Sequence, residues 1–247
     1  MPDNADLLLS PGWPAPESVR SVITTRLGGV GEAPFDSLNL ALHVGDDPAT
    51  VAENRRRLRA LAQLPAEPEW LDQVHGKRVL DCPAEGGDRQ ADAATTTRPG
   101  QVLVVMTADC LPLLLCDRQG SRVAAVHAGW RGLAAGVIEQ AVAKFNQPGD
   151  QLLAWLGPAI GPLAFEVGDE VREQFVSIDP GAASAFRSAR PGHWMANIYQ
   201  LARLRLQRLG VGFVGGDDYC TVNDSRRFFS YRRDGVTGRM ASLIWIK

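Results

Sequence analysis

Short runs of apolar residues, separated by turn-forming residues, recur along the chain. Residues 102–106, 113–116, 122–126 and 152–156 are such runs, rich in valine, leucine and alanine. Runs of this length, bounded by turn signals, are typical of strands that lie buried inside a protein. Two further strands are expected, one over residues 21–25 and one over residues 243–246.

Helical spacing of apolar residues appears in three other segments. In residues 48–64 the apolar positions share one face, and a run of arginines that is more typical of a solvated surface occupies the other. A second helical pattern begins at Gly132 and ends near Pro148, and a third covers residues 196–209. Strands that alternate with helices indicate an α/β fold.

Composition is that of an ordinary globular protein. Apolar residues make up 45% of the 247 positions and charged residues 22%, which is enough apolar material for a sizeable core. The net charge of −2 gives no electrostatic reason to expect a nucleic acid or an anionic membrane surface as partner.

No targeting or membrane segment is apparent in the sequence. The amino terminus is acidic and lacks the basic start of a secretory signal. The longest apolar stretch, residues 102–116, is broken by Asp109 and Pro112 and is too short to span a bilayer. The four cysteines are scattered, with no Cys-x-x-Cys pair. The expected compartment is therefore a reducing cytoplasm.

Two of the four histidines and one cysteine lie in short motifs that indicate chemistry. They are His75 in Gln-Val-His-Gly, Cys110 in Thr-Ala-Asp-Cys and His127 in His-Ala-Gly-Trp-Arg-Gly. Two imidazoles and a thiolate are ligands that zinc or copper prefers, and three protein ligands leave a tetrahedral position open for catalysis. The three positions are too far apart for a zinc finger, so the fold must bring them together at its strand ends. The sequence therefore indicates an enzyme.

Two chemistries compete for these three residues. In the first, His75, Cys110 and His127 bind a metal that activates a water or polarises a substrate. In the second, Cys110 is a thiolate nucleophile activated by His127, with Asp109 or another acceptor orienting the imidazole. The metal hypothesis uses both histidines, whereas the nucleophile hypothesis leaves His75 without a role. A four-copper oxidase is excluded, because its copper centres need far more imidazoles than four histidines supply.

Eight motifs occur in the order and spacing of one known family. They are TTRLGGV at 24–30, SLNL at 37–40, QVHG at 73–76, DA at 92–93, TADC at 107–110, HAGWRG at 127–132, GPAIG at 157–161 and FFSYRR at 228–233. On this joint pattern the chain resembles bacterial members of the laccase-domain or polyphenol-oxidase family, which includes the peptidoglycan editing factor and purine nucleoside phosphorylases of the same fold. The resemblance extends from about Ser21 to Trp245.

The resemblance implies a fold, a cofactor and an activity. The implied fold is a single-domain α/β/β/α sandwich with mixed β-sheets over residues 1–247, related to the catalytic domain of the cytotoxic necrotizing factor toxins. The implied cofactor is zinc, with copper as the alternative, bound by residues matching His75, Cys110 and His127. The implied activity is phosphorolysis of adenosine, inosine and methylthioadenosine, with adenosine deamination in some members. Copper-dependent polyphenol oxidation and the editing of peptidoglycan precursors are also attributed to the family.

A phosphorylase needs cationic donors for phosphate and polar groups for the departing purine. Arg26, beside a glycine-rich turn, and Arg131, after the third ligand, are the candidate substrate-binding cations. Asn39 is the candidate hydrogen-bonding group for the base or the ribose. A cluster of arginines near the end of the sequence has two interpretations, a solvated surface or a phosphate site; its members are Arg226, Arg227, Arg232, Arg233 and Arg239.

The candidate catalytic residues are Cys110, His127 and Asp109, with Asp109 expected to orient a metal ligand or to cap its loop. His43 and His193 lack comparable surroundings and are expected to be surface or packing residues. The same metal could serve deamination, although the signature of the usual nucleobase deaminases is absent. Two rival functions stay open: a cysteine hydrolase that acts on a cell-wall precursor amide, and a structural zinc protein.

Overall fold

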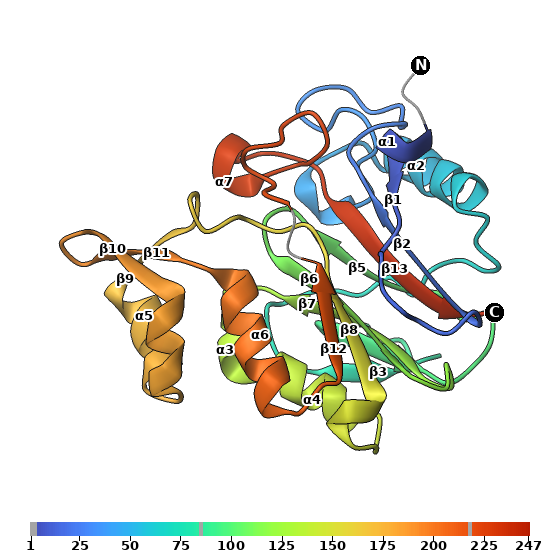
Figure 1. Cartoon of the computed structure of the whole chain (residues 1–247). Coiled ribbons are helices and arrows are strands. Elements are labelled where there is room, and N and C mark those ends of the chain that lie inside the picture. Colours follow the sequence, from blue (N-terminus) through green and yellow to red (C-terminus); the bar gives the residue numbers. More distant parts are fainter. Residues whose placement is uncertain (1–3, 84–85, 217–218) are drawn as a thin grey trace.

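Three sheets organise the chain in a computed structural model that describes residues 4–83, 86–216 and 219–247 (Figure 1). The antiparallel sheet has, among these residues, the strand order β1 (Leu8–Leu9), β2 (Val19–Thr24), β13 (Met240–Ile246) and β5 (Leu103–Thr107). The mixed sheet has the order β12 (Phe213–Gly216), β8 (Leu152–Leu156), β6 (Leu111–Asp117), β7 (Val123–Ala128), β4 (Ala93–Thr96) and β3 (Val79–Asp81). The small sheet has the order β10 (Phe186–Arg190), β11 (His193–Ala196) and β9 (Glu166–Gly168).

The antiparallel and mixed sheets pack face to face because their strands are apolar on both sides. In β13, Ile244 and Ile246 belong to the cluster that fills the layer between the two sheets. Leu243 and Trp245, at the alternate positions, belong to a separate cluster on the outer side. This division follows from the alternation of side chains along a strand, and β6 is divided in the same way.

Helices cover the outer faces of both sheets and give the layer order α/β/β/α that the resemblance implied (Figure 1). The antiparallel sheet is covered by α2 (Pro48–Leu61), whose Leu58 lies in the same cluster as Leu243. The mixed sheet is covered by three helices: α3 (Trp130–Ala135), α4 (Val137–Ala143) and α6 (Ile198–Arg208). Side-chain caps begin two of these helices, since Asp47 accepts from an amide of α2 and Asn197 from one of α6.

The expected strands are confirmed, with bounds that differ by a few residues. The helix expected from Gly132 to Pro148 instead begins at Trp130, ends at Ala143 and is divided in two. Its division lies at Gly136, which has a φ of 94°, because this left-handed conformation ends one helix before the next begins.

No apolar pattern in the sequence predicts the segment that projects from the sandwich. This segment carries the small sheet and α5 (Asp169–Val176), which lie apart from the two large sheets in Figure 1. Four of the five β10 side chains are exposed, so the strand has no apolar run by which it could be predicted. Short elements complete the described chain: α1 (Asn4–Leu7), α7 (Tyr231–Asp234) and 3-10 turns at Leu42–Val44, Gly149–Gln151 and Pro180–Ala185.

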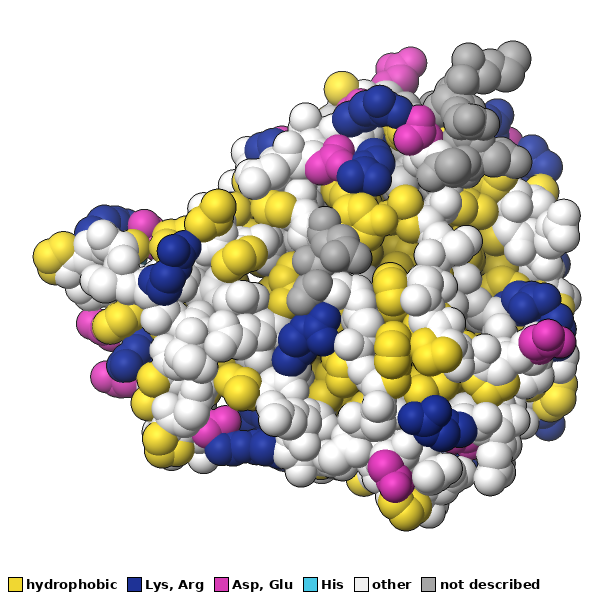
Figure 2. All heavy atoms as spheres, in the orientation of Figure 1, with side chains coloured by type: hydrophobic (Ala, Val, Ile, Leu, Met, Phe, Trp, Pro, Cys, Tyr) yellow, Lys and Arg dark blue, Asp and Glu magenta, His cyan; other side chains and the backbone are white. Residues whose placement is uncertain are grey.

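The surface has no segment suited to a membrane span and no dominant charge on the face in view. Among the described residues, no helix is long and apolar enough to cross a bilayer. On the face shown in Figure 2, basic and acidic side chains are interspersed rather than gathered into a patch of one sign. The exposed Arg56 and Arg57 of α2 pair with Glu53 on the same helix, as a solvated helix face requires.

Candidate metal centre and active site

One end of the mixed sheet brings Cys110 and His127 together. β6 and β7 are antiparallel neighbours, with Leu111 opposite Ala128 and Pro112 opposite His127. Cys110 therefore precedes one strand at the same edge where His127 ends the other. Both lie at the sheet edge at which the sequence predicted a site.

His75 reaches this edge from a turn outside the sheets. Its backbone has a φ of 60°, and Asp109, which precedes Cys110, has a φ of 92°. Side-chain-bearing residues seldom adopt positive φ, and such strained positions cluster at functional sites. One of these two residues is a candidate ligand and the other directly precedes Cys110, so the unusual backbone conformations lie where the candidate ligands meet.

A buried carboxylate, Asp92, fixes two of the ligands. Its Oδ1 accepts hydrogen bonds from His127 Nδ1 at 2.8 Å and from the His75 amide at 2.8 Å, and its Oδ2 accepts from the Gly76 amide at 2.6 Å. Burial opposes ionisation, but the hydrogen bond and charge of His127 and the two amides outweigh it and lower the pKa of Asp92. Since the carboxylate occupies Nδ1 of His127, Nε2 is the nitrogen left for a ligand role.

The donor atoms of His75, Cys110 and His127 lie within 4.8 Å of one another. His75 Nε2 is 3.7 Å from Cys110 Sγ, and the two imidazoles meet edge to face with ring centroids 4.8 Å apart. Gly129 keeps this space open, because a Cβ there would lie 2.9 Å from His75 Cδ2 and 3.0 Å from Cys110 Sγ. Two nitrogens and one sulfur at this spacing fit a metal ion, and the cluster could hold one.

The cluster also favours a thiolate at Cys110. Burial raises the pKa of Cys110, but the charge of His127 and hydrogen bonds from His127 and His75 outweigh it and lower that pKa to about 6. Burial lowers the pKa of His127, but the Cys110 charge and the Asp92 hydrogen bond raise it to about 9. A thiolate is the form that binds metals and the form that attacks electrophiles, so this pair is compatible with both chemistries raised by the sequence.

Two cavities flank the cluster and share His75, Ala108, Cys110 and Tyr231 in their walls. The first, of about 250 Å³, has a largely apolar wall with two arginines; its other members are Asp109, Trp130, Arg131, Ile160, Phe165, Ile198 and Arg232. The second, of about 290 Å³, is more polar; its other members are His43, Gln73, Met106, Thr107, His127 and Arg239. The candidate metal centre thus lies at the border of two cavities, which we call the Phe165 cavity and the Arg239 cavity.

Asp109 lies in the Phe165 cavity but does not orient an imidazole. Its Oδ1 accepts from Thr221 Oγ1 at 2.6 Å, and its Oδ2 accepts from the Arg232 amide at 2.6 Å. Asp109 therefore ties the Cys110 turn to a segment more than a hundred residues away in the sequence. The acceptor that orients His127 is Asp92, which was named from the sequence only within the DA motif at 92–93 and was given no chemical role.

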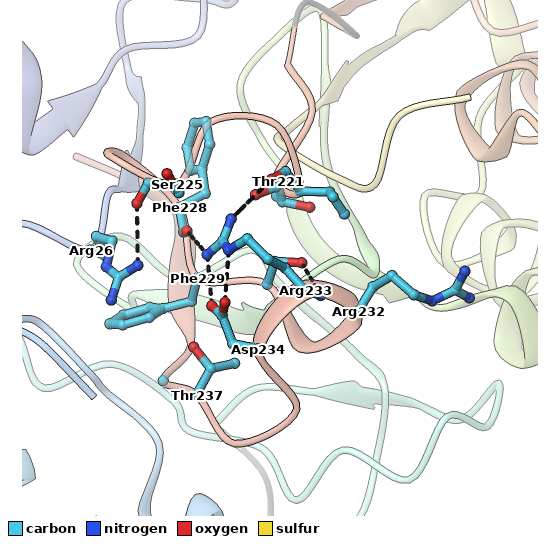
Figure 3. A network of polar contacts seen from close by, with 12 residues as sticks. Arg26, Thr221, Ser225, Phe228, Phe229, Arg232, Arg233, Asp234 and Thr237 are labelled. Atoms are coloured by element: carbon cyan, nitrogen blue, oxygen red, sulfur yellow. Dashed lines mark hydrogen bonds and ion pairs between the residues drawn. The ribbon is translucent and has the colours of Figure 1, made fainter. Parts of the chain in front are cut away.

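The three predicted substrate-binding residues lie in different places. Arg131 lines the Phe165 cavity, with its guanidinium 4.4 Å from the Trp130 ring centroid. Arg26 is not among the described residues that line either cavity, since it donates to Asp36 and to the Ser225 carbonyl. Figure 3 shows Arg26 beside Ser225 at one side of the polar network that surrounds Arg233.

Asn39, the predicted hydrogen-bonding residue, is fully buried and acts on the backbone. Its Oδ1 accepts from the Arg239 amide at 3.0 Å, and its Nδ2 donates to the Ala41 carbonyl and to Asp46. Asn39 therefore supports the segment that carries Arg239 rather than lining either cavity among the described residues.

The arginine cluster near the end of the sequence divides into two groups. Three members pair with carboxylates: Arg226 with Asp6, Arg227 with Asp224 and Arg233 with Asp234. The other two line the cavities, Arg232 in the Phe165 cavity and Arg239 in the Arg239 cavity. In Figure 3 the Arg232 side chain extends away from the Arg233–Asp234 pair. The first three are therefore occupied by acidic partners, whereas a phosphate role stays a prediction for Arg232 and Arg239.

His43 is exposed, as the sequence suggested, and it also lines the Arg239 cavity. Burial and the charge of Arg239 lower the pKa of His43, which favours the neutral imidazole. Tyr231, which lines both cavities, was also missed, although it lies in the FFSYRR motif. A lone histidine or tyrosine gives no sequence signal, since only the fold brings it to the ligands.

Two bacterial proteins are similar to this chain over almost its whole length. A protein of Pseudomonas aeruginosa named purine nucleoside phosphorylase is 58% identical over 240 residues, which cover 97% of this chain and 98% of that protein. YfiH of Escherichia coli, also named purine nucleoside phosphorylase, is 54% identical over 240 residues, which cover 97% and 98% of the two chains.

Solved structures share the fold over almost the whole chain. A crystal structure of a Neisseria meningitidis protein superposes with a TM-score of 0.94 at 48% identity and covers 97% of this chain and 99% of that one. YlmD from Geobacillus stearothermophilus has a TM-score of 0.88 at 31% identity, with 96% and 94% covered. The family model of the multi-copper polyphenol oxidoreductase laccase matches residues 20–247, a range that includes the whole mixed sheet and all three candidate ligands. The chain therefore belongs to this laccase-like family.

Proposed function

We propose that this protein is a zinc-dependent purine nucleoside phosphorylase that acts on adenosine, inosine and methylthioadenosine. The observation that carries the proposal is the His75, Cys110 and His127 donor set with a cavity on each side of it. The two relatives that bear the name purine nucleoside phosphorylase at 58% and 54% identity support the reaction class. Zinc is favoured over copper because two imidazoles and one thiolate, with a tetrahedral position left open, form a typical catalytic zinc set.

The reaction needs two substrates at one carbon atom. A phosphate oxygen forms a bond to C1′ of the ribose, and the bond from C1′ to the purine nitrogen breaks, with its electron pair leaving on the base. Bound zinc would supply a Lewis acid at the border of the two cavities. Ile160, Phe165 and Ile198 offer an apolar wall for the purine, and the arginines of the cavities offer charge for phosphate.

A cysteine hydrolase that acts on a peptidoglycan precursor is the second candidate. The Cys110–His127 pair favours it, because a thiol with a pKa of about 6 beside an imidazole is typical of a nucleophile. This alternative gives His75 no part in the chemistry, although Asp92 holds the His75 backbone and the His127 ring together. Adenosine deamination at the same centre and copper-dependent polyphenol oxidation are the remaining family activities to be tested.

A substrate panel on protein of defined metal content separates these functions. With zinc-loaded protein and inosine, we expect hypoxanthine and ribose 1-phosphate to appear only when phosphate is added. Adenosine that yields inosine without phosphate would indicate deamination, and a phenol oxidised only by copper-loaded protein would indicate the oxidase. The proposal is wrong if inosine stays intact with and without phosphate while metal-free protein cleaves an aminoacyl precursor.

We further propose that residues 1–247 act as one catalytic domain in a reducing cytoplasm, with a purine nucleoside and phosphate as small-molecule partners. The single-domain proposal is supported by β13, which comes from the end of the sequence yet pairs with β2 and β5. The four cysteines are free, which supports a compartment where thiols stay reduced.

A further inference from the structure

Arg239 is a partly buried cation for which the described chain supplies no carboxylate partner. Its Nη1 donates to the carbonyls of Thr237 and Gly238, and its amide donates to Asn39. These bonds fix the position of the guanidinium without neutralising its charge. Among the described residues, no hydrogen bond uses Nε or Nη2 of Arg239, so those donors are available to another group.

The acidic groups around Arg239 already have other functions. Asp109 and Cys110 act on Arg239 through their charge, but both Asp109 oxygens are hydrogen bonded to Thr221 and to the Arg232 amide. Cys110 belongs to the candidate metal cluster. A guanidinium that is partly shielded from water, has no paired anion and keeps free donors is well suited to bind an anion.

The two arginines of the Phe165 cavity differ from Arg239 in this respect. Arg131 and Arg232 are both exposed, so water screens their charges. The Arg131 guanidinium lies over the Trp130 ring, and Arg232 Nη1 donates to the Glu166 carbonyl at 3.0 Å. Each therefore has full access to solvent and a protein partner, whereas Arg239 is less exposed and its side chain is hydrogen bonded only to backbone carbonyls.

The remaining walls of the two cavities carry different side chains. The Phe165 cavity has a flat aromatic ring and aliphatic side chains, which suit the faces of a purine. The Arg239 cavity adds His43, Gln73 and Thr107, which are polar. Both Gln73 amide atoms bond the Met106 backbone, so Gln73 is a fixed part of the wall rather than a free donor.

On this basis, and given the proposed phosphorylase function, we propose that the Arg239 cavity is the phosphate subsite and that the Phe165 cavity holds the purine. Arg239 binds two phosphate oxygens through Nε and Nη2, with His43 beside it. The ribose then lies at the shared border, next to His75, Cys110 and Tyr231, with its C1′ between the incoming phosphate and the outgoing base. Attack and departure thus occur from opposite sides of the candidate metal centre, and the released base takes up a proton from water.

Initial rates on zinc-loaded full chains test this assignment. Arg239→Gln removes the charge, Arg239→Lys keeps it, and Arg226→Gln is the matched control on an exposed arginine that pairs with Asp6. We expect Arg239→Gln to raise the KM for phosphate about tenfold or more while the KM for inosine changes less than about threefold. Arg239→Lys should recover part of the loss, and Arg226→Gln should change neither constant. Phe165→Leu should raise the KM for inosine alone.

Two results would overturn the assignment in an active enzyme. The first is a KM for phosphate that is unchanged in Arg239→Gln. The second is a KM for phosphate that rises in Arg131→Gln but not in Arg239→Gln. The melting temperature and metal content of each variant identify misfolded protein. If Arg239→Gln is misfolded, the KM for phosphate of Arg239→Lys is compared with that of the parent chain instead.

A binding measurement keeps the test separate from the proposed reaction. Equilibrium dialysis with labelled inorganic phosphate should give a site in the parent chain that is lost in Arg239→Gln and kept in Arg226→Gln. If no chain cleaves inosine yet this pattern holds, the phosphorylase proposal is wrong and the anion subsite stands. The subsite proposal is wrong if phosphate binds the parent chain and Arg239→Gln equally, or if it binds neither chain. This conclusion does not depend on whether the parent chain cleaves inosine.

Discussion

The Nδ1 atom of His127 lies 2.8 Å from Oδ1 of Asp92, and the same oxygen accepts the His75 amide hydrogen. One fully buried carboxylate thus sets the ring of one candidate ligand and the backbone of another. The candidate metal centre consequently depends on Asp92, a residue that is not itself one of the three candidate ligands.

Asp92→Asn should weaken metal binding. The amide cannot carry the charge that holds Nδ1 of His127, and loss of such a partner typically costs about 10- to 100-fold in metal affinity. Competition with a chelator of known affinity measures the effect. Asp109→Asn is the matched control, because Asp109 bonds Thr221 and the Arg232 amide rather than a ligand. Equal losses of zinc affinity in both variants would contradict the role given to Asp92.

Each ligand should be necessary for metal, while the metal should not be necessary for the fold. The parent chain is expected to bind about one zinc per chain, with His75→Ala, Cys110→Ala and His127→Ala each losing most of it. Chelated protein should keep its far-ultraviolet circular dichroism and melt cooperatively, because two sheets and their helices bury a core of their own. Full zinc occupancy in Cys110→Ala would exclude the metal assignment and favour the nucleophile.

Gly129→Ala should damage the centre without removing a ligand. The added Cβ would lie 2.9 Å from His75 Cδ2 and 3.0 Å from Cys110 Sγ, so the ligands must move apart. We expect at least a tenfold loss of zinc affinity, with far-ultraviolet circular dichroism unchanged. Gly87→Ala is the matched control, since no atom lies within 4 Å of the Cβ it would add. Normal zinc binding by Gly129→Ala would show that the ligands are not as tightly placed as described.

The metal-free protein should react with iodoacetamide selectively at Cys110. Burial and the charge of Asp117 raise the pKa of Cys116 to about 12, whereas His127 and His75 outweigh burial and lower that of Cys110 to about 6. The thiolate is the reactive form, so Cys110 alkylation should rise with pH through about 6, well below the range of an ordinary thiol. Alkylation is carried out in steps of about one pH unit between about pH 5 and 9, and mass spectrometry of the products gives the midpoint. Zinc should protect Cys110, and a midpoint above about 8 would contradict the prediction.

Strands and ligands were predictable from the sequence for different reasons. Residues 152–156 form a strand with the expected bounds, because an apolar run between turn signals has few other places in a folded chain. The ligands were found because histidine and cysteine are rare and chemically distinctive. Arg26, by contrast, was chosen by its neighbours in sequence, and its guanidinium is used by Asp36 and Ser225.

The supporting residues could not be predicted because their roles depend on long-range contacts. Arg239 enters a cavity beside Cys110 although the two lie far apart in sequence, and Asp92 meets His127 across two paired strands. Neither residue type is unusual, so pattern alone does not separate Arg239 from Arg226. In the structure, Arg226, Arg227 and Arg233 pair with carboxylates, and this pairing separates them from Arg239.

The position of β13 has a consequence for synthesis of the protein. β2 and β5 flank this strand and reach each other only through it, although β13 is the last strand of the chain. A nascent chain therefore carries all three ligands long before its antiparallel sheet can close, and the ribosome must release residues 240–246 before the sandwich is complete. Until then, the apolar inner face of the mixed sheet lacks Ile244 and Ile246, so the layer between the two sheets is completed last.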